Sequence, residues 1–568
     1  MLYEEVIVNF GGNGRPCVVR IGGSLLVVAK HTRGGNGPGS DQLIFATNVL
    51  WQGAWTPTQG RDVFLGEYRA PSGQTFSALT SFVGRRVVFA DGAWNLHQGS
   101  NFVGGQGGNV GLAWIHLGES GSGGAGFEDY GPSDGHATIN LAGTQDFGNT
   151  VFCLGGRSIG SMTMGKGTLN ISGSSTRINM GGIWSCYGGQ GEVNISGGAF
   201  VMARSLSNAH STTNEIADGH VNITGAGTVL ETDINTTAVS GNSYITVSDG
   251  ATLRTHGYSS GGSTRPFTGI YEAILKATGS ASRIDLVGDI LFADRGQVIV
   301  EQGAKLSGRR SVTSHTTPMD ACTLIARSGG DIHLEGIQNT SFEVDGPKSS
   351  ISIDTYLSAR RFTVTGGGRV EFLPTHGLGG RMVYLNQFLG ERGYGLVDSE
   401  SFMSLGTGTP ALGFLQIGLD MHLGNLDFYG NLRVINGATI QTQSESPSFF
   451  VHGNAEFLSG ALIADYFQPI TVSGTLTLTE NFSYDVDPTT LAYGHRVPLF
   501  KVLSGQVIGT MNPRLTGIRF WRYSLENDMY IATVAATPEP ASLISLAAGM
   551  GAILTRRSSR KGTRGSYR

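Results

Sequence analysis

Short runs of alternating apolar and polar residues recur along the chain, and its central stretch repeats one phrase almost unchanged. The three best copies are Gly167-Thr-Leu-Asn-Ile-Ser-Gly173, Gly191-Glu-Val-Asn-Ile-Ser-Gly197 and Gly219-His-Val-Asn-Ile-Thr-Gly225. Looser copies follow at Tyr244–Gly250, Ile274–Gly279 and Gln297–Gly303. Aligned on the residue before the first apolar position, four copies lie at positions 168, 192, 220 and 244, at intervals of 24, 28 and 24 residues. A period in this range is typical of a stacked repeat array.

The alternation within one copy predicts a short strand with one apolar face. It points Leu169 and Ile171 to one side and Asn170 and Ser172 to the other. A lone strand of this length cannot bury its apolar face, whereas stacking on the same strand of the next coil buries it and pairs both backbone edges. A second strand is expected after each Gly-centred turn, at Thr176–Met180, Ala199–Met202, Thr228–Glu231, Ala251–Arg254 and Lys305–Ser307. The sequence therefore predicts an all-β fold, a right-handed parallel β-helix or β-solenoid.

Asparagine recurs at the same position of the three best copies, as Asn170, Asn194 and Asn222. These side chains either form an outward polar ladder or lie inward and hydrogen-bond to their copies one coil away. The alternation favours the outward position.

The repeats at residues 131–480 are flanked by less regular segments. Residues 1–130 are expected to be the β-rich start or cap of the solenoid, and the favoured role of its tryptophans, Trp51, Trp55, Trp94 and Trp114, is capping and core packing rather than a sugar-stacking platform. Residues 374–424 are expected to be an insertion or a distorted coil. Residues 481–535 are predicted to form a β cap of hairpin strands that covers the last open edge.

Composition narrows the classes of function. The 88 glycines suit many tight turns, and the net charge of −4 gives no electrostatic case for nucleic-acid binding. The four cysteines are far apart and form no Cys-x-x-Cys pair, so a zinc or redox site has little support and a single disulfide cannot be assigned. No cofactor is expected.

The C-terminal residues 536–568 combine three features in a fixed order. Pro538-Glu539-Pro540 comes first, the apolar segment Leu543–Leu554 follows, and a basic cluster begins with Arg556 and Arg557. This arrangement resembles the PEP-CTERM sorting signal of bacteria that possess an exosortase, although the chain continues past the basic cluster. The resemblance implies export, a short membrane helix as a temporary inner-membrane anchor, recognition by an exosortase-type enzyme with cleavage near Pro538–Pro540, and delivery to the cell surface or extracellular matrix.

Physical arguments agree with this resemblance. A helix of twelve residues spans about 18 Å, less than the roughly 30 Å hydrocarbon core, and flanking arginines can hold its cytoplasmic end. The repeats also resemble, in pattern, the autotransporter-adhesin type found beside such tails. Met1–Val8 lacks a basic n-region and an apolar core. We therefore expect that the chain begins downstream of the natural start.

A polysaccharide-active enzyme is the alternative, because lyases and glycoside hydrolases also use parallel β-helices. Such a site needs converging acidic groups. The best candidates are acids with two neighbouring arginines: Asp285, Asp289 and Asp294, with Arg283 and Arg295. Solvated turn positions explain them at least as well. A Ca²⁺ site is a weaker candidate, at Glu128, Asp129 and Asp134. The favoured function is that of an exported structural or adhesive protein, with extracellular polysaccharide as a candidate partner.

Overall fold

The computed structural model describes strands between Cys17 and Val534, and the side chains of most strands and turns from residue 138 onward, with gaps at several loops. In this part of the chain every regular element is a β-strand. The contacts divide the chain into two units. Unit 1 is Met1–Met382 with Asp398–Met403, and unit 2 is Val383–Val397 with Ser404–Arg568.

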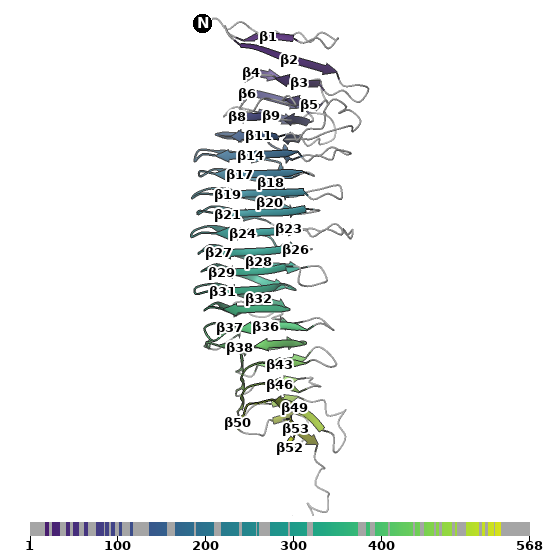
Figure 1. Cartoon of the computed structure of the whole chain (residues 1–568), viewed down its shortest axis with the longest axis vertical. Coiled ribbons are helices and arrows are strands. Elements are labelled where there is room, and N and C mark those ends of the chain that lie inside the picture. The colour runs from purple at the N-terminus through teal and green to yellow at the C-terminus, as the bar shows by residue number, and fades with distance from the viewer. Residues whose placement is uncertain are drawn as a thin grey trace, which may run out of the picture. The chain divides into compact units, whose positions relative to one another are not determined.

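The repeated phrase forms strands of one long sheet, which we call sheet B and which has strands in both units. Its central strands in unit 1 are β11 (His136–Leu141), β14 (Lys166–Ser172), β17 (Gln190–Ser196), β19 (Ala217–Thr224) and β21 (Gly241–Ser248), and each pairs in parallel with the next. The register joins Thr168 to Glu192, Glu192 to His220, and His220 to Tyr244. The intervals read from the sequence are therefore the coil lengths, and Figure 1 shows these strands as successive layers.

The second strand of each coil belongs to a second sheet, which we call sheet A. In unit 1 it includes the parallel strands β15 (Arg177–Met180), β18 (Phe200–Asn208), β20 (Val229–Thr237), β22 (Thr252–Thr255) and β25 (Arg283–Leu286). A further segment that the sequence did not indicate follows in several coils, for example β16 (Gly182–Trp184), which pairs with the second half of β18. The prediction of parallel stacked strands is confirmed.

The beginning of unit 1 differs from its repeats. Strands β1 (Cys17–Ile21), β2 (Leu25–Arg33) and β3 (Asp41–Phe45) pair antiparallel, and from the pairing of β3 with β5 (Asp62–Leu65) onward the described pairings of unit 1 are parallel. The strands that carry the four tryptophans are part of this β-rich segment, and their side chains lie outside the described residues.

The core of unit 1 consists of files of aliphatic side chains at equal register. One file in sheet B contains Ile139, Leu169, Val193, Val221, Ile245 and Leu275, all at 0% exposure. Burying one such side chain contributes roughly 1.5–3 kcal/mol, and the entropy of ordering the coil offsets much of it. Because each coil contacts only its neighbours, stability accumulates by stacking.

A buried hydroxyl organises alternate turns between the two sheets. Thr176 Oγ1 donates to the carbonyl of Ser172 at 2.6 Å and accepts from the N–H of Gly143, in the preceding coil, at 3.0 Å. Thr228 repeats this arrangement two coils later, donating to Thr224 O at 2.8 Å and accepting from the N–H of Gly198 at 2.9 Å. The turn between them has Ala199 at this position. These hydroxyls satisfy backbone groups that the strand ladders leave unpaired.

Unit 2 continues the coil plan with shorter strands. Its sheet B strands are β36 (Gly393–Val397), β40 (Leu426–Tyr429), β43 (Phe449–Val451), β46 (Ile470–Val472) and β49 (Arg496–Val502), all in parallel. The stretch 374–424, expected to be irregular, contains five strands between Met382 and Leu423, and the boundary of the two units falls within it.

The end of unit 2 agrees with the predicted hairpin cap in part. Strand β53 (Met529–Val534) pairs antiparallel with both β49 and β52 (Trp521–Glu526). Strand β50 (Val507–Gly509), however, pairs in parallel with β47 (Leu476–Leu478). The hairpin interpretation was wrong for strand β50, because this strand extends a coil of the stack.

Candidate functional site

Of the acidic residues proposed as a catalytic group, the structure describes Asp285 and Asp289. Asp285 lies on the outward face of β25, with Oδ2 3.5 Å from Nε of Arg283 and 4.0 Å from the guanidinium of Arg254. Arg254 in turn lies 3.2 Å from Glu231 in the preceding coil. Asp285 is thus one member of an ion-pair ladder across three coils. Such half-exposed pairs contribute about 0–1 kcal/mol each.

The remaining members of that proposed group are described only in part. Asp289 is exposed in the turn after β25. Asp294 and Arg295 lie outside the described residues, as do the candidate Ca²⁺ ligands Glu128, Asp129 and Asp134. Among the side chains that the structure does describe, no three His, Cys, Asp or Glu residues gather as metal ligands would.

Among the acids whose side chains the structure describes, Glu301 is the most enclosed one with charged partners. Its side chain is 9% exposed and lies 2.7 Å from Lys276 Nζ and 2.8 Å from Arg327 Nε, which belong to the preceding and following coils. Burial alone would raise the pKa of Glu301, but the hydrogen bonds and charges of Lys276 and Arg327 lower it below its ordinary value. Both donors are occupied by one carboxylate, so the group holds three strands together.

The cysteines that the structure describes are structural. Cys153, Cys186 and Cys322 are buried, and Cys186 Sγ donates to the carbonyl of Gly189 at 2.6 Å. Burial raises the pKa of Cys322 well above its ordinary value, so this thiol stays protonated and unreactive at neutral pH.

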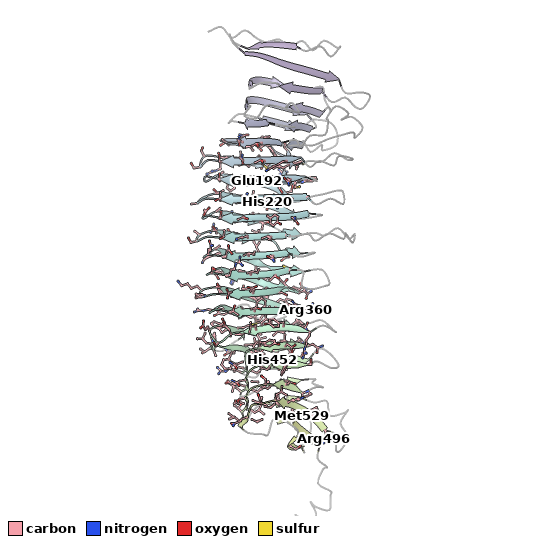
Figure 2. All side chains as sticks on the ribbon, in the orientation of Figure 1. Glu192, His220, Arg360, His452, Arg496 and Met529 are labelled. Carbon is pink, nitrogen blue, oxygen red and sulfur yellow. The ribbon has the colours of Figure 1, made fainter. Side chains whose placement is uncertain are left out.

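The recurring asparagines form a hydrogen-bonded ladder on the outward face of sheet B. Asn170 Nδ2 donates to Asn140 Oδ1 at 2.8 Å, Asn194 to Asn170 at 3.0 Å, and Asn222 to Asn194 at 2.9 Å. The side chains are half-buried. The predicted outward position of these asparagines is confirmed. Hydrogen bonds between asparagines of successive coils, which we had expected only for an inward position, form on the outward face. Glu192 and His220, labelled in Figure 2, lie in the adjacent outward column.

Unit 2 carries a different outward surface, which we call the aromatic patch: Arg392, Tyr394, Asp427, Tyr429, Phe450 and His452. It covers the consecutive sheet B strands β36, β40 and β43 with their flanking residues. The rings of Tyr429 and His452 stack with centroids 4.0 Å apart and planes at 1°, and Tyr394 lies 5.4 Å from Tyr429. Both tyrosines are 38% exposed. Figure 2 labels His452 in this unit.

The polar members of the aromatic patch are only partly satisfied. Arg392 Nε lies 2.9 Å from Asp427 Oδ2, while Asp427 Oδ1 lies 3.7 Å from His452 Nε2. That distance is too long for a hydrogen bond. Asp427 Oδ1 and His452 Nε2 are both covered atoms without a hydrogen-bond partner among the described residues. Such groups are uncommon in folded proteins and call for an explanation.

Sequence reasoning did not identify the aromatic patch, although a signal was present. Tyr429 and His452 each stand directly before a turn glycine, Gly430 and Gly453. That shared place relative to the turn puts them at neighbouring positions of successive coils. The strands before them are only four and three residues long, so their alternation is too short to assign a register.

The predicted sorting residues, Pro538, Glu539, Pro540, Arg556 and Arg557, and the segment Leu543–Leu554 lie outside the described residues. Within the part that is described, no helix has the length and apolarity that a membrane span requires. Comparison of the chain with models of protein families, with curated proteins and with solved structures found no match.

Proposed function

We propose that this chain is an exported structural or adhesive protein of the cell surface or extracellular matrix, built as a right-handed β-solenoid. Its tail, with Pro538-Glu539-Pro540 and a short membrane helix at Leu543–Leu554, is the address that an exosortase-type enzyme reads. The observation that carries the structural role is the Asn ladder of Asn140, Asn170, Asn194 and Asn222, because it uses the outward polar groups of four coils to bind the coils to one another.

The charged side chains of unit 1 support the same proposal. Glu301 binds strands of three coils through Lys276 and Arg327, and Asp285 is shared by Arg254 and Arg283. A general acid or nucleophile needs a carboxyl group directed at a substrate. These carboxylates instead face arginine and lysine side chains of their own and neighbouring coils, which favours a structural role over the alternative of a polysaccharide lyase or glycoside hydrolase.

The sorting signal is testable in a bacterium that possesses an exosortase. Replacing Pro538, Glu539 and Pro540 with alanine should stop processing and leave the protein in the inner-membrane fraction, whereas Thr537→Ala, next to the triad, should be processed normally. Cell fractionation and immunoblotting measure both. Unchanged processing and surface delivery of the triple variant would overturn the proposed sorting.

The adhesive role needs a second experiment. Cells that display the protein should bind polysaccharide-coated surfaces more strongly than cells in which its gene is deleted. Equal binding by the two strains, with surface display verified by antibody, would contradict adhesion and leave only the structural role.

A further inference from the structure

The aromatic patch of unit 2 has hydrogen-bonding capacity that none of the described residues uses. Asp427 Oδ1 and His452 Nε2 face each other at 3.7 Å, and neither has a partner among the described residues. An oxygen to one side of the pair, within hydrogen-bond distance of both atoms, can donate to the carboxylate and accept from the Nε2–H tautomer of the imidazole. A hydroxyl group, which is both donor and acceptor, matches this pair.

The surroundings of this pair restrict the class of ligand. Arg392 Nε lies 2.9 Å from Asp427 Oδ2, so the formal charges of these two residues cancel. This pair therefore offers no net electrostatic attraction to a polyanion. Tyr394 and Tyr429 are 38% exposed and add phenol hydroxyls beside apolar ring edges. Neutral polar groups set among partly exposed aromatic rings suit a ligand that has many hydroxyls and apolar C–H surfaces.

We propose that Arg392, Tyr394, Asp427, Tyr429 and His452 form a binding site for a neutral polysaccharide. One sugar hydroxyl lies between Asp427 and His452, and the guanidinium of Arg392 and the two phenols contact neighbouring hydroxyls. Adjacent strands are about 4.8 Å apart, which is close to the length of one sugar unit, so successive units meet successive coils. The proposal rests on the proposed adhesive function and names the chemical class of its ligand.

Access to the Asp427–His452 pair requires a small movement of side chains. Both atoms are covered in the unliganded arrangement, whereas their residues keep about a quarter of each side chain exposed (22% for Asp427, 24% for His452). We expect a small rotation of the imidazole about its side-chain bonds to expose Nε2 when a ligand binds. The aromatic stack of His452 on Tyr429 is the contact that such a rotation breaks.

Binding is measured by isothermal titration of the full-length protein in detergent with hexasaccharides. The probes are neutral oligomers of glucose, mannose and galactose, with an oligouronate of the same length as the charged comparison. We expect at least one neutral oligomer to bind and the oligouronate to bind more weakly. Binding of the oligouronate alone, or of none of the four, overturns the proposal.

Three variants locate the site. Asp427→Asn keeps the shape of the side chain and should weaken binding at least ~10-fold, because a charged acceptor is lost. Tyr429→Phe keeps the ring stack and should weaken binding about 3-fold through loss of one hydroxyl. The matched control is Tyr244→Ala in unit 1, where Tyr244 also stacks on a histidine, His220, at 4.7 Å, and binding should stay within about 2-fold.

The results of these experiments distinguish a failure of the proposed site from a failure of the proposed adhesive function. Equal weakening by Tyr244→Ala and Asp427→Asn would place binding elsewhere and overturn the site. If Asp427→Asn abolishes saccharide binding while the cells still adhere, the site stands and the adhesive role belongs to another surface. Circular dichroism tests whether each variant is folded. If Asp427→Asn does not fold, the binding affinity of Tyr429→Phe, which retains the ring stack, decides whether the site is correct.

Discussion

The Asn ladder of unit 1 and the aromatic patch of unit 2 lie on outward faces of the same coil plan and give opposite results. In unit 1 identical asparagines stand at equal register, and each amide donates to the carbonyl oxygen of its copy. In unit 2 unlike side chains stand at neighbouring positions, and Asp427 Oδ1 and His452 Nε2 have no hydrogen-bond partner among the described residues. A repeated amide satisfies itself because donor and acceptor recur at the coil spacing. A mixed surface keeps hydrogen-bonding capacity for a ligand.

The largest loss of stability should come from a substitution in the backbone of β17, the strand that carries Asn194 of the Asn ladder. A Cβ at Gly191 would lie 1.1 Å from the carbonyl oxygen of Ser185. Gly191→Ala should therefore displace β17 and destabilise unit 1 by at least about 3 kcal/mol. Chemical denaturation measures the change. Gly148→Ala is the control: it meets no atom within 4 Å and carries only the strain of a positive φ of 56°, about 1–2 kcal/mol. Equal effects would show that the contact with Ser185 is relieved easily.

The next largest effect concerns the Asn ladder itself. Asn194→Ala removes two hydrogen bonds between coils, to Asn170 and from Asn222, and should cost about 1–3 kcal/mol. Asn222→Ala removes only the bond to Asn194 and should cost about half as much. Denaturation of both variants measures the difference. If the Asn194 variant is as stable as the native chain, the ladder does not hold the coils together.

Glu301 should give a smaller effect that depends on pH. Its folded pKa is lowered below the ordinary 4.5, so its stabilisation is fully present above that pH and is lost as the pH falls through the folded pKa. Glu301→Gln should cost about 1–2 kcal/mol at neutral pH and little in acid. Denaturation at a series of pH values measures this. A constant difference between the two proteins from neutral to acid pH would contradict the role of Lys276 and Arg327.

The smallest effect on stability is expected in the aromatic patch. Tyr429→Phe removes a half-exposed hydroxyl and keeps the stack on His452, so the free energy of unfolding should change by less than about 0.5 kcal/mol. Thermal melting of the variant tests this. A loss as large as that of Asn194→Ala would mean that the two surfaces do not differ as proposed, because the phenol would then be part of the scaffold.

Much of the scaffold of unit 1 was predictable because its repeats are local and regular. The spacing of Thr168, Glu192, His220 and Tyr244 matches the observed register position by position. The third strand segment of the coils was not predictable, since pieces such as Gly182–Trp184 are too short to show an alternation. The short strand Val507–Gly509 was assigned to a hairpin for the same reason.

The candidate site was harder to predict than the scaffold. Asp285 stands among several charged residues in the sequence, and only the pairing of β22 with β25 shows that Arg254 faces it. Glu301 and its partners Lys276 and Arg327 are separated by about one coil each, so no local motif joins them. Tyr394 is separated from Tyr429 by an irregular stretch that no period spans.

The amino-acid sequence by itself determined the strands, their alternation and their coil lengths in the repeats, because a short strand with one apolar face is stable only when it stacks on its copies. It also carries the tail that predicts export. The tertiary structure alone decided which outward side chains meet. That choice depends on the lengths of the loops and on the third strand segments, which set the register of residues 20 to 40 positions apart. Self-pairing of the asparagines and the open pair of Asp427 and His452 both follow from that register.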